Sequence, residues 1–313
     1  MENIPTQNFE SQEDKEDYSS KIELRIFRHG KKEDSKEGQP DEKVHLTKEG
    51  KKESMREADD GTVDQSVAYG SPRERSQQTA AYTMAGNMPE ITGNESFDEL
   101  KDKLEGNIEV GSKIGTEDRL NFSDPDLESE YGEWLIEAFK DGRFLSALIK
   151  DSDQKAEELQ DDEAPTYSTY AANIAQIIDR YIKASSRWDD LVEDSENDYE
   201  KELERYLGTH TGVAESFLAK VIEKMEGVDE RNEFLKAVGP AGFDFNEGFE
   251  IDIINNHGDR RIQIIYSTET ENGEVYEFNE IIPSEIITDI ANIERIEKDE
   301  ESQNDKNNEG VEG

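Results

Sequence analysis

The chain reads Ile22-Glu23-Leu24-Arg25-Ile26-Phe27-Arg28-His29-Gly30 near its start, an apolar run that ends in a basic tripeptide. The branched and aromatic residues of this run predict a first strand over 22–27. Two later segments have the same form. The run SPRERSQQTA at 71–80 follows a short apolar segment, and Gly208-Thr209-His210-Thr211-Gly212 follows another. In an open α/β sheet the carboxyl ends of the strands border one crevice, so these three segments are expected to converge there.

A helix is predicted near each of these segments. Thr47 is a suitable cap for a helix that runs to about Ala58. Ser71 is a suitable cap for a second helix, with Pro72 at its first position and Glu74 three residues after the cap. An apolar stripe with helical spacing also follows the last of the three segments. Because helices alternate with strands, the expected fold class is α/β, a three-layer sandwich with a mainly parallel sheet flanked by helices.

The middle and the end of the chain depart from this alternation. From about 90 to 198 the sequence is acidic and mainly helical, and its apolar stripes at 131–139 and 167–181 are interpreted as core contacts of a helical insertion. Three further strands are predicted at 249–254, 262–266 and 275–278. Turn residues separate these strands, which indicates a C-terminal group of antiparallel strands.

Composition limits the partners and the location of the protein. The chain has 313 residues, a hydrophobic share of 32%, no cysteine and a net charge of −42. Disulfide and thiolate chemistry are excluded, and so acidic a protein would repel nucleic acid and anionic membranes. The N-terminus lacks the apolar stretch of a signal peptide, and no apolar run approaches the roughly 20 residues that span a bilayer. A cytoplasmic protein is expected, with disordered tails at 1–20 and 298–313 around one domain at 21–297.

The residue types of the three segments suit a site that handles phosphate. Arg28 and Arg75 carry planar guanidinium groups that match phosphate oxygens, and the helix N-termini beside them add backbone N–H donors. His29 and His210 allow transfer through a phosphohistidine, in which one imidazole attacks in line while the cations stabilise charge on the equatorial oxygens. Arg73 is interpreted as a solvated side chain, with a second anion contact as the alternative.

In order and spacing these motifs resemble those of the histidine phosphatase superfamily, the phosphoglycerate mutase-like proteins. The family's Arg-His-Gly is matched at 28–30, its Leu-Thr-x-x-Gly at 46–50, its Ser-Pro-x-x-Arg-x-x-Gln-Thr-Ala at 71–80 and its second histidine motif at 208–212. The resemblance extends in the correct order from about residue 21 to residue 225.

The resemblance implies roles for individual residues. His29 is expected to be the nucleophile that becomes phosphorylated. The residues expected to complete the phosphate pocket are Arg28, Arg75 and His210. Those expected to bind substrate are Gly30, Ser71 and Thr211.

The general acid, which protonates the leaving alkoxide, is assigned to Asp102. The mutase-like branch of the family carries this acid in a Leu-x-Glu-x-x-x-Gly pattern, which residues 100–106 match with aspartate in place of glutamate. A rival alignment uses Arg119–Phe122, which puts a phenylalanine at the position of the acid and makes Asp124 the nearest substitute. The phytase-like branch has an aspartate directly after the second histidine, where this chain has Thr211.

A phosphatase that acts on a small phosphorylated substrate, without a cofactor, is the leading hypothesis. A mutase is disfavoured, because Lys31–Ser35 stands where phosphoglycerate mutases have the Glu/Gln-Ser-x-Trp-Asn stretch that grips their substrate. The alternative from another class is a non-catalytic module that binds a phospho-ligand or a protein. The four histidines of the chain have no HxxxH or HxH spacing, so no metal site is expected.

Overall fold

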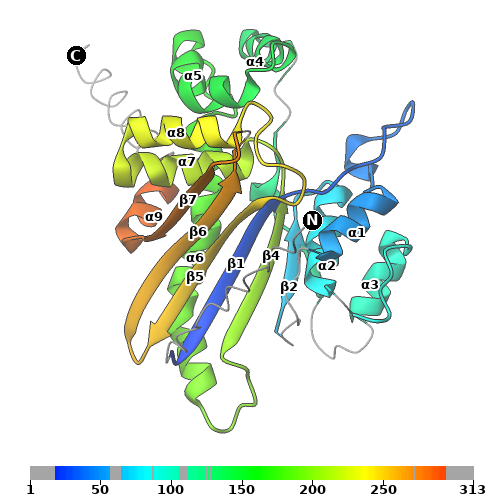
Figure 1. Ribbon diagram of the computed structural model, residues 1–313, viewed down its shortest axis with the longest axis vertical. Helices are drawn as coiled ribbons and strands as arrows, with labels where there is room; N and C mark the ends of the chain where they lie inside the picture. The colour runs from blue at the N-terminus through cyan, green and yellow to red at the C-terminus, as the bar shows by residue number, and fades with distance from the viewer. Residues whose placement is uncertain are drawn as a thin grey trace, which may run out of the picture.

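The computed structural model describes residues 18–56, 65–86, 88–105, 112–123, 126, 128–270 and 272–293. Within this part of the chain one seven-stranded sheet carries helices on both faces (Figure 1). The strands are β1 (Ser20–Arg28), β2 (Val67–Gly70), β3 (Ile114–Thr116), β4 (Glu202–Thr209), β5 (Gly248–Asn256), β6 (Asp259–Glu269) and β7 (Val275–Ile281). The sequence places Ser20 in the N-terminal tail, but Ser20 is buried and opens β1. The rest of that tail up to residue 17, and the C-terminal tail, lie outside the described residues.

The sheet is parallel in one half and antiparallel in the other. Its strand order is β3-β2-β4-β1-β5-β6-β7. The first four strands in this order pair in parallel, while β5 is antiparallel to β1, β6 to β5 and β7 to β6. The predicted α/β class with C-terminal antiparallel strands is confirmed, and the sheet as a whole is mixed. The sequence pattern does not predict β3, because Ile114 is the only large apolar residue in this three-residue strand.

The helices form a layer on each face of the sheet. One layer contains α1 (Lys48–Arg56), α2 (Glu74–Ala85) and α3 (Phe97–Glu105), on the right of Figure 1. The other contains α6 (Tyr167–Glu193), α7 (Val213–Glu226), α8 (Val228–Val238) and α9 (Ser284–Ala291). At the top of Figure 1, α4 (Glu130–Lys140) and α5 (Phe144–Leu159) stand beyond the carboxyl ends of β1 and β4. Short 3-10 turns, η1 (Asp41–Lys43) and η2 (Asp118–Leu120), follow β1 and β3.

The alternation of side chains along β1 builds a core on each face of the sheet. Ile22, Leu24 and Ile26 have no exposed surface and pack in the same cluster as the apolar stripes of α6 and α7. Phe27 points to the opposite face, into the cluster built around α2. Burying one such side chain contributes roughly 1.5–3 kcal/mol to folding. The apolar stripe of α6 lies in the core, as the sequence predicts.

Two local expectations differ from the structure. The stripe of α4 includes Phe139, which is 70% exposed because it lies near the outer end of the helix, against the edge of Phe144. The second predicted helix starts late, since α2 begins at Glu74 with Arg73 as its N-cap residue. Ser71 does not cap the helix in the predicted way, because its hydroxyl accepts a hydrogen bond from the Arg73 N–H and otherwise contacts the side chains of Ser76 and His210.

None of the described helices combines the length and the apolar composition that crossing a bilayer requires.

Candidate active site

The three motifs meet at the carboxyl ends of neighbouring strands. His29 follows β1, His210 follows β4, and Ser71 follows β2, which lies on the other side of β4. The rings of His29 and His210 are 5.1 Å apart between centroids and inclined at 66°. Both are buried, with 7% and 4% of their surfaces exposed. Arg75, in the first turn of α2, completes the group and is 3% exposed.

Two glycines allow the start of α2 to lie directly on the sheet. A Cβ atom on Gly70 would overlap the backbone nitrogen of Gln77, and one on Gly208 would overlap the carbonyl oxygen of Ser76. Any larger residue at either strand end would push the helix away from the histidines. The glycine of the second histidine motif is therefore explained by the position that Arg75 must reach.

The tautomer of His29 is fixed by its neighbour. Its Nδ1 lies 2.8 Å from the carbonyl oxygen of Gly30, which can only accept a hydrogen bond, so Nδ1 carries the proton. Nε2 then keeps its lone pair and accepts a hydrogen bond from Nε of Arg75 at 3.3 Å. Burial lowers the pKa of His29 to about 3, against the opposing effect of the Gly30 hydrogen bond and with the help of the nearby cations. The imidazole is thus neutral near pH 7, as a nucleophile must be.

His210 is held by the segment that precedes α2. Its Nε2 lies 2.7 Å from Oγ of Ser71, a hydrogen bond whose proton can belong to either group. The Ser71 hydroxyl also lies 2.9 Å from Oγ of Ser76. Burial lowers the pKa of His210 well below its ordinary value, and the charges of His29 and Arg75 act in the same direction. Ser71 therefore orients the second histidine as well as lying beside the pocket.

The guanidinium of Arg28 faces the loop between α8 and β5. It donates to the carbonyl oxygen of Phe243 and lies 4.6 Å from the centroid of the Phe245 ring. Phe245 is 43% exposed, and its centroid is 6.2 Å from that of His29. Beneath this loop the fully buried Glu215 accepts hydrogen bonds from the backbone N–H groups of Gly212 and Phe243. Arg28 and Glu215 thus join this loop to the segments that follow β1 and β4.

Gly30 and Thr211 occupy the edges of the site. The N–H of Gly30 donates to Oγ1 of Thr79 at 2.9 Å, and Thr79 in turn donates to the carbonyl oxygen of Arg75. This chain of contacts ties the loop after β1 to α2. Thr211 is half-buried, with its methyl group against Gly242.

The contacts described so far do not identify the general acid that the sequence analysis assigns to Asp102. Asp102 is exposed on α3, which packs on the outer side of α2 through Phe97 and Leu100, so the structure does not bring it to the histidine pair. The segment Arg119–Phe122, which the rival alignment uses, contacts the start of α2. Arg73 donates to the carbonyl oxygen of Phe122 at 3.0 Å. Asp124 lies outside the described residues.

Sequence reasoning misses Asp41, and for Arg73 it prefers solvation to the anion contact that the structure shows. Arg73 is expected to be solvated but is 9% exposed, and its Nη1 lies 3.1 Å from a carboxylate oxygen of Asp41. Asp41 lies in η1 and also accepts a hydrogen bond from Nη2 of Arg75 at 2.8 Å. The spacing of two arginines two residues apart hints at a shared anion, but no local signal identifies Asp41 as that anion.

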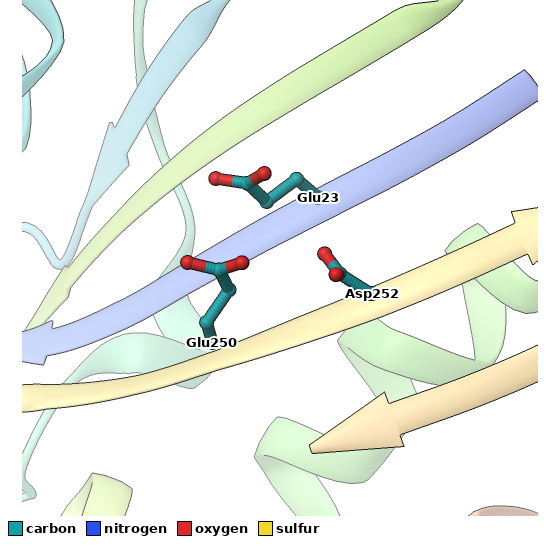
Figure 2. Close-up of side chains that lie close together, drawn as sticks. All are labelled: Glu23, Glu250 and Asp252. Carbon is teal, nitrogen blue, oxygen red and sulfur yellow. The ribbon is translucent and has the colours of Figure 1, made fainter. Parts of the chain in front are cut away.

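One group of carboxylates has the spacing of a cation site. Glu23 on β1 and Glu250 and Asp252 on β5 project from the same face of the sheet (Figure 2), with ligand atoms within 4.8 Å of one another. Lys21 lies 2.8 Å from Glu23 and 2.9 Å from Asp252, and Arg25 pairs with Glu23 and Glu250. Each of the three carboxylates is therefore already paired with Lys21 or Arg25, and the cluster is an ion-pair network of the sheet.

Comparisons with known proteins agree with this geometry. Residues 24–140 match the model of the histidine phosphatase superfamily (branch 1), a match that includes His29 and Arg75 and ends before His210. No curated protein matches the chain. The match to the family supports a phosphatase or mutase-like function.

Several solved structures are similar to the chain. Mycobacterial glucosyl-3-phosphoglycerate phosphatase is 15% identical, with 74% of this chain and 91% of that chain covered and a TM-score of 0.42. Mycobacterial hydrolase 2 is 14% identical, with 88% and 98% covered and a TM-score of 0.46. A variant of phosphoserine phosphatase from Entamoeba histolytica, in complex with phosphoserine, is 17% identical, with 77% and 94% covered and a TM-score of 0.37. The resemblance to the histidine phosphatase superfamily that the motifs predict is confirmed by the family match over residues 24–140.

Proposed function

We propose that this protein hydrolyses small phosphomonoesters through a phosphohistidine formed on His29. The observation that carries the proposal is the tautomer of His29: the proton on Nδ1 leaves Nε2 with its lone pair, which accepts a long hydrogen bond from Arg75 beside His210 and can be turned to phosphorus when a phosphoryl group takes the place of that contact. A nucleophile, a second imidazole and a guanidinium fork at one point are what in-line phosphoryl transfer needs.

The reaction has two steps that balance in atoms and charge. In the first, Nε2 of His29 bonds to phosphorus while the ester P–O bond breaks, and the alkoxide leaves with a proton from a general acid. In the second, water attacks phosphorus and gives its proton to the carboxylate that the general acid has become, the P–N bond breaks, the electron pair returns to Nε2 of His29, and inorganic phosphate leaves. Arg75 and His210 would donate to the equatorial oxygens in both steps, where the charge they stabilise is greatest in the transition state.

The residue that gives this proton to the leaving alkoxide is proposed separately. The prediction of Asp102 requires α3 to deliver an exposed carboxylate to the pocket, whereas the segment that ends at Phe122 already contacts Arg73. Asp102 and Asp124 are therefore both candidates for this acid, and Asp124 lies outside the described residues. A mutase remains disfavoured because the loop after Gly30 carries Lys31–Ser35.

The test is release of phosphate from an aryl phosphate ester by wild type and by His29→Ala. The variant should lose at least about 10³-fold in kcat, since it lacks the imidazole that would bond to phosphorus. His257→Ala is the matched control, because this histidine is exposed on the turn between β5 and β6. Rapid acid-free quenching with labelled substrate should trap phosphate on wild type only. Full activity of His29→Ala would reject the proposal, and phosphate binding by wild type without turnover would favour the non-catalytic module.

A further inference from the structure

The phosphate-binding edge of Arg75 is occupied by groups of the protein itself. In a guanidinium, Nε–H and Nη2–H point from the same edge, which is an edge that grips two oxygens of a carboxylate or a phosphate. Here Nε donates to His29 Nε2 at 3.3 Å and Nη2 donates to Asp41 Oδ2 at 2.8 Å. The carboxylate of Asp41 therefore lies where a phosphate oxygen would bind beside the nucleophile.

Three more contacts hold Asp41 in this position. Nη1 of Arg75 donates to its backbone carbonyl oxygen at 2.9 Å, Nη1 of Arg73 lies 3.1 Å from Oδ2, and Nζ of Lys32 lies 3.6 Å from Oδ1. Partial burial acts to raise the pKa of the Asp41 carboxyl, but the hydrogen bond from Arg75 and the three positive charges lower it below its ordinary value. Asp41 is thus an anion near pH 7, shared by cations from the loop after β1 and from the start of α2.

The segment that carries Asp41 can release it at low cost. The side chain is 37% exposed, and no residue of η1 is buried. The anchors of this loop lie after the turn, at the buried Val44 and Leu46. Moving η1 toward solvent would expose little apolar surface and would transfer the carboxylate to water, where it is well solvated.

We propose that Asp41 is the resident anion of the phosphate pocket: it neutralises Arg73 and Arg75 in the free protein and is displaced by the phosphoryl group of a substrate or by inorganic phosphate. A phosphate monoester carries about 1.5 to 2 negative charges at pH 7 and a carboxylate carries one, so the exchange favours phosphate over singly charged anions. The inference rests on the phosphate pocket of the proposed function but does not require turnover.

The test measures binding of inorganic phosphate to the full chain by titration calorimetry at pH 7.5. Asp41→Asn keeps the size of the side chain and removes its charge, and it should bind phosphate about tenfold more tightly than wild type, the equivalent of about 1.4 kcal/mol of lost competition. Glu42→Gln is the matched control, because it makes the same change in net charge one residue away on an exposed side chain. This control should remain within about twofold of wild type, since the long-range effect of one surface charge is screened.

Other results of this titration would either overturn the inference or separate it from the proposed phosphatase activity. Equal affinities for Asp41→Asn and Glu42→Gln, or weaker binding by Asp41→Asn, would overturn the inference, and so would failure of all three proteins to bind phosphate. Asp41→Ala provides a second variant if the asparagine variant melts at a lower temperature. Tighter binding by Asp41→Asn, in a protein whose wild type releases no phosphate from esters, would refute the phosphatase proposal and leave this inference standing.

Discussion

Replacement of His29 by glutamine should flatten the dependence of folding stability on pH between about 7.5 and 5. Burial, reinforced by the nearby cations and opposed by the hydrogen bond to Gly30, lowers the pKa of His29 to about 3 from an ordinary value of 6.5. The unfolded chain therefore takes up a proton below pH 6.5 that the folded protein refuses. The stability associated with the neutral ring is fully present above pH 6.5 and is lost as the pH falls toward 3.

The magnitude follows from the linkage between proton uptake and folding. Each pH unit between 6.5 and 3 costs the folded state about 1.4 kcal/mol, so the loss reaches about 2 kcal/mol at pH 5. The measurement is urea unfolding of wild type and His29→Gln at several pH values, followed by circular dichroism. Wild type should lose about 2 kcal/mol more than the variant between pH 7.5 and 5.

A control separates this effect from the titration of the many carboxyl groups. His257→Gln makes the same substitution at an exposed histidine and is measured alongside. Carboxyl groups titrate alike in all three proteins, so they cancel in the comparison. If wild type and His29→Gln lose the same free energy over this range, His29 is not buried as a neutral base, and the argument for its readiness as a nucleophile fails with it.

Three further changes should have measurable effects. Phe245→Ala should raise KM for aryl phosphates several-fold and leave KM for glycerol phosphate nearly unchanged, because the exposed ring of Phe245 borders His29. Phe139→Ala, on α4, is the control. Equal effects of Phe245→Ala on the two substrates would contradict a role of this ring in specificity. Gly208→Ala should destabilise the fold by about 1–3 kcal/mol in urea unfolding, since its Cβ would overlap the Ser76 carbonyl oxygen. Burial and the charges of its carboxylate neighbours raise the pKa of Glu250 to about 7, so stability is lost as the pH rises from 4.5 through 7. Glu250→Gln should therefore raise the melting temperature at pH 8 and not at pH 4, and a variant that melts below wild type at pH 8 would refute this reading.

The sequence predicts those elements whose own pattern of apolar residues reflects which side chains are buried. The run at 22–27 is predicted as a strand because it is rich in branched and aromatic residues, and in the structure both of its faces are covered, so that only Arg25 in it is not buried. The long stripe of α6 likewise repeats with the helical period because one face of the helix is buried. By contrast, β3 is too short to show a period, and only its pairing with β2 makes it a strand.

The site divides in the same way. His29, Arg75 and His210 can be found from sequence because each follows a strand end in a fixed local motif. The sequence analysis interprets Ser71 as a helix cap, because a pattern of neighbouring residues does not predict a hydrogen bond to His210, which lies 139 residues later in the chain. Asp41 is missed, and the anion contact of Arg73 is only the alternative in the sequence analysis, for the same reason: this contact joins a loop to the start of a helix that lies later in the chain.

The net charge of the protein explains why the arginines of the site contact oxygen atoms of the protein itself. The net charge of −42 opposes any phosphate ligand at long range, so affinity must come from close cations. Buried cations without partners would themselves destabilise the fold. Here Arg28 meets the carbonyl oxygen of Phe243, Arg73 meets that of Phe122, and Arg75 meets Asp41. The two carbonyl oxygens belong to the backbone, whereas the carboxylate of Asp41 is on a side chain that is 37% exposed and can be exchanged for a ligand. Phosphate affinity is therefore the difference between phosphate and Asp41 on the same guanidinium edge, and a change at Asp41 should alter it more than the removal of any distant surface carboxylate.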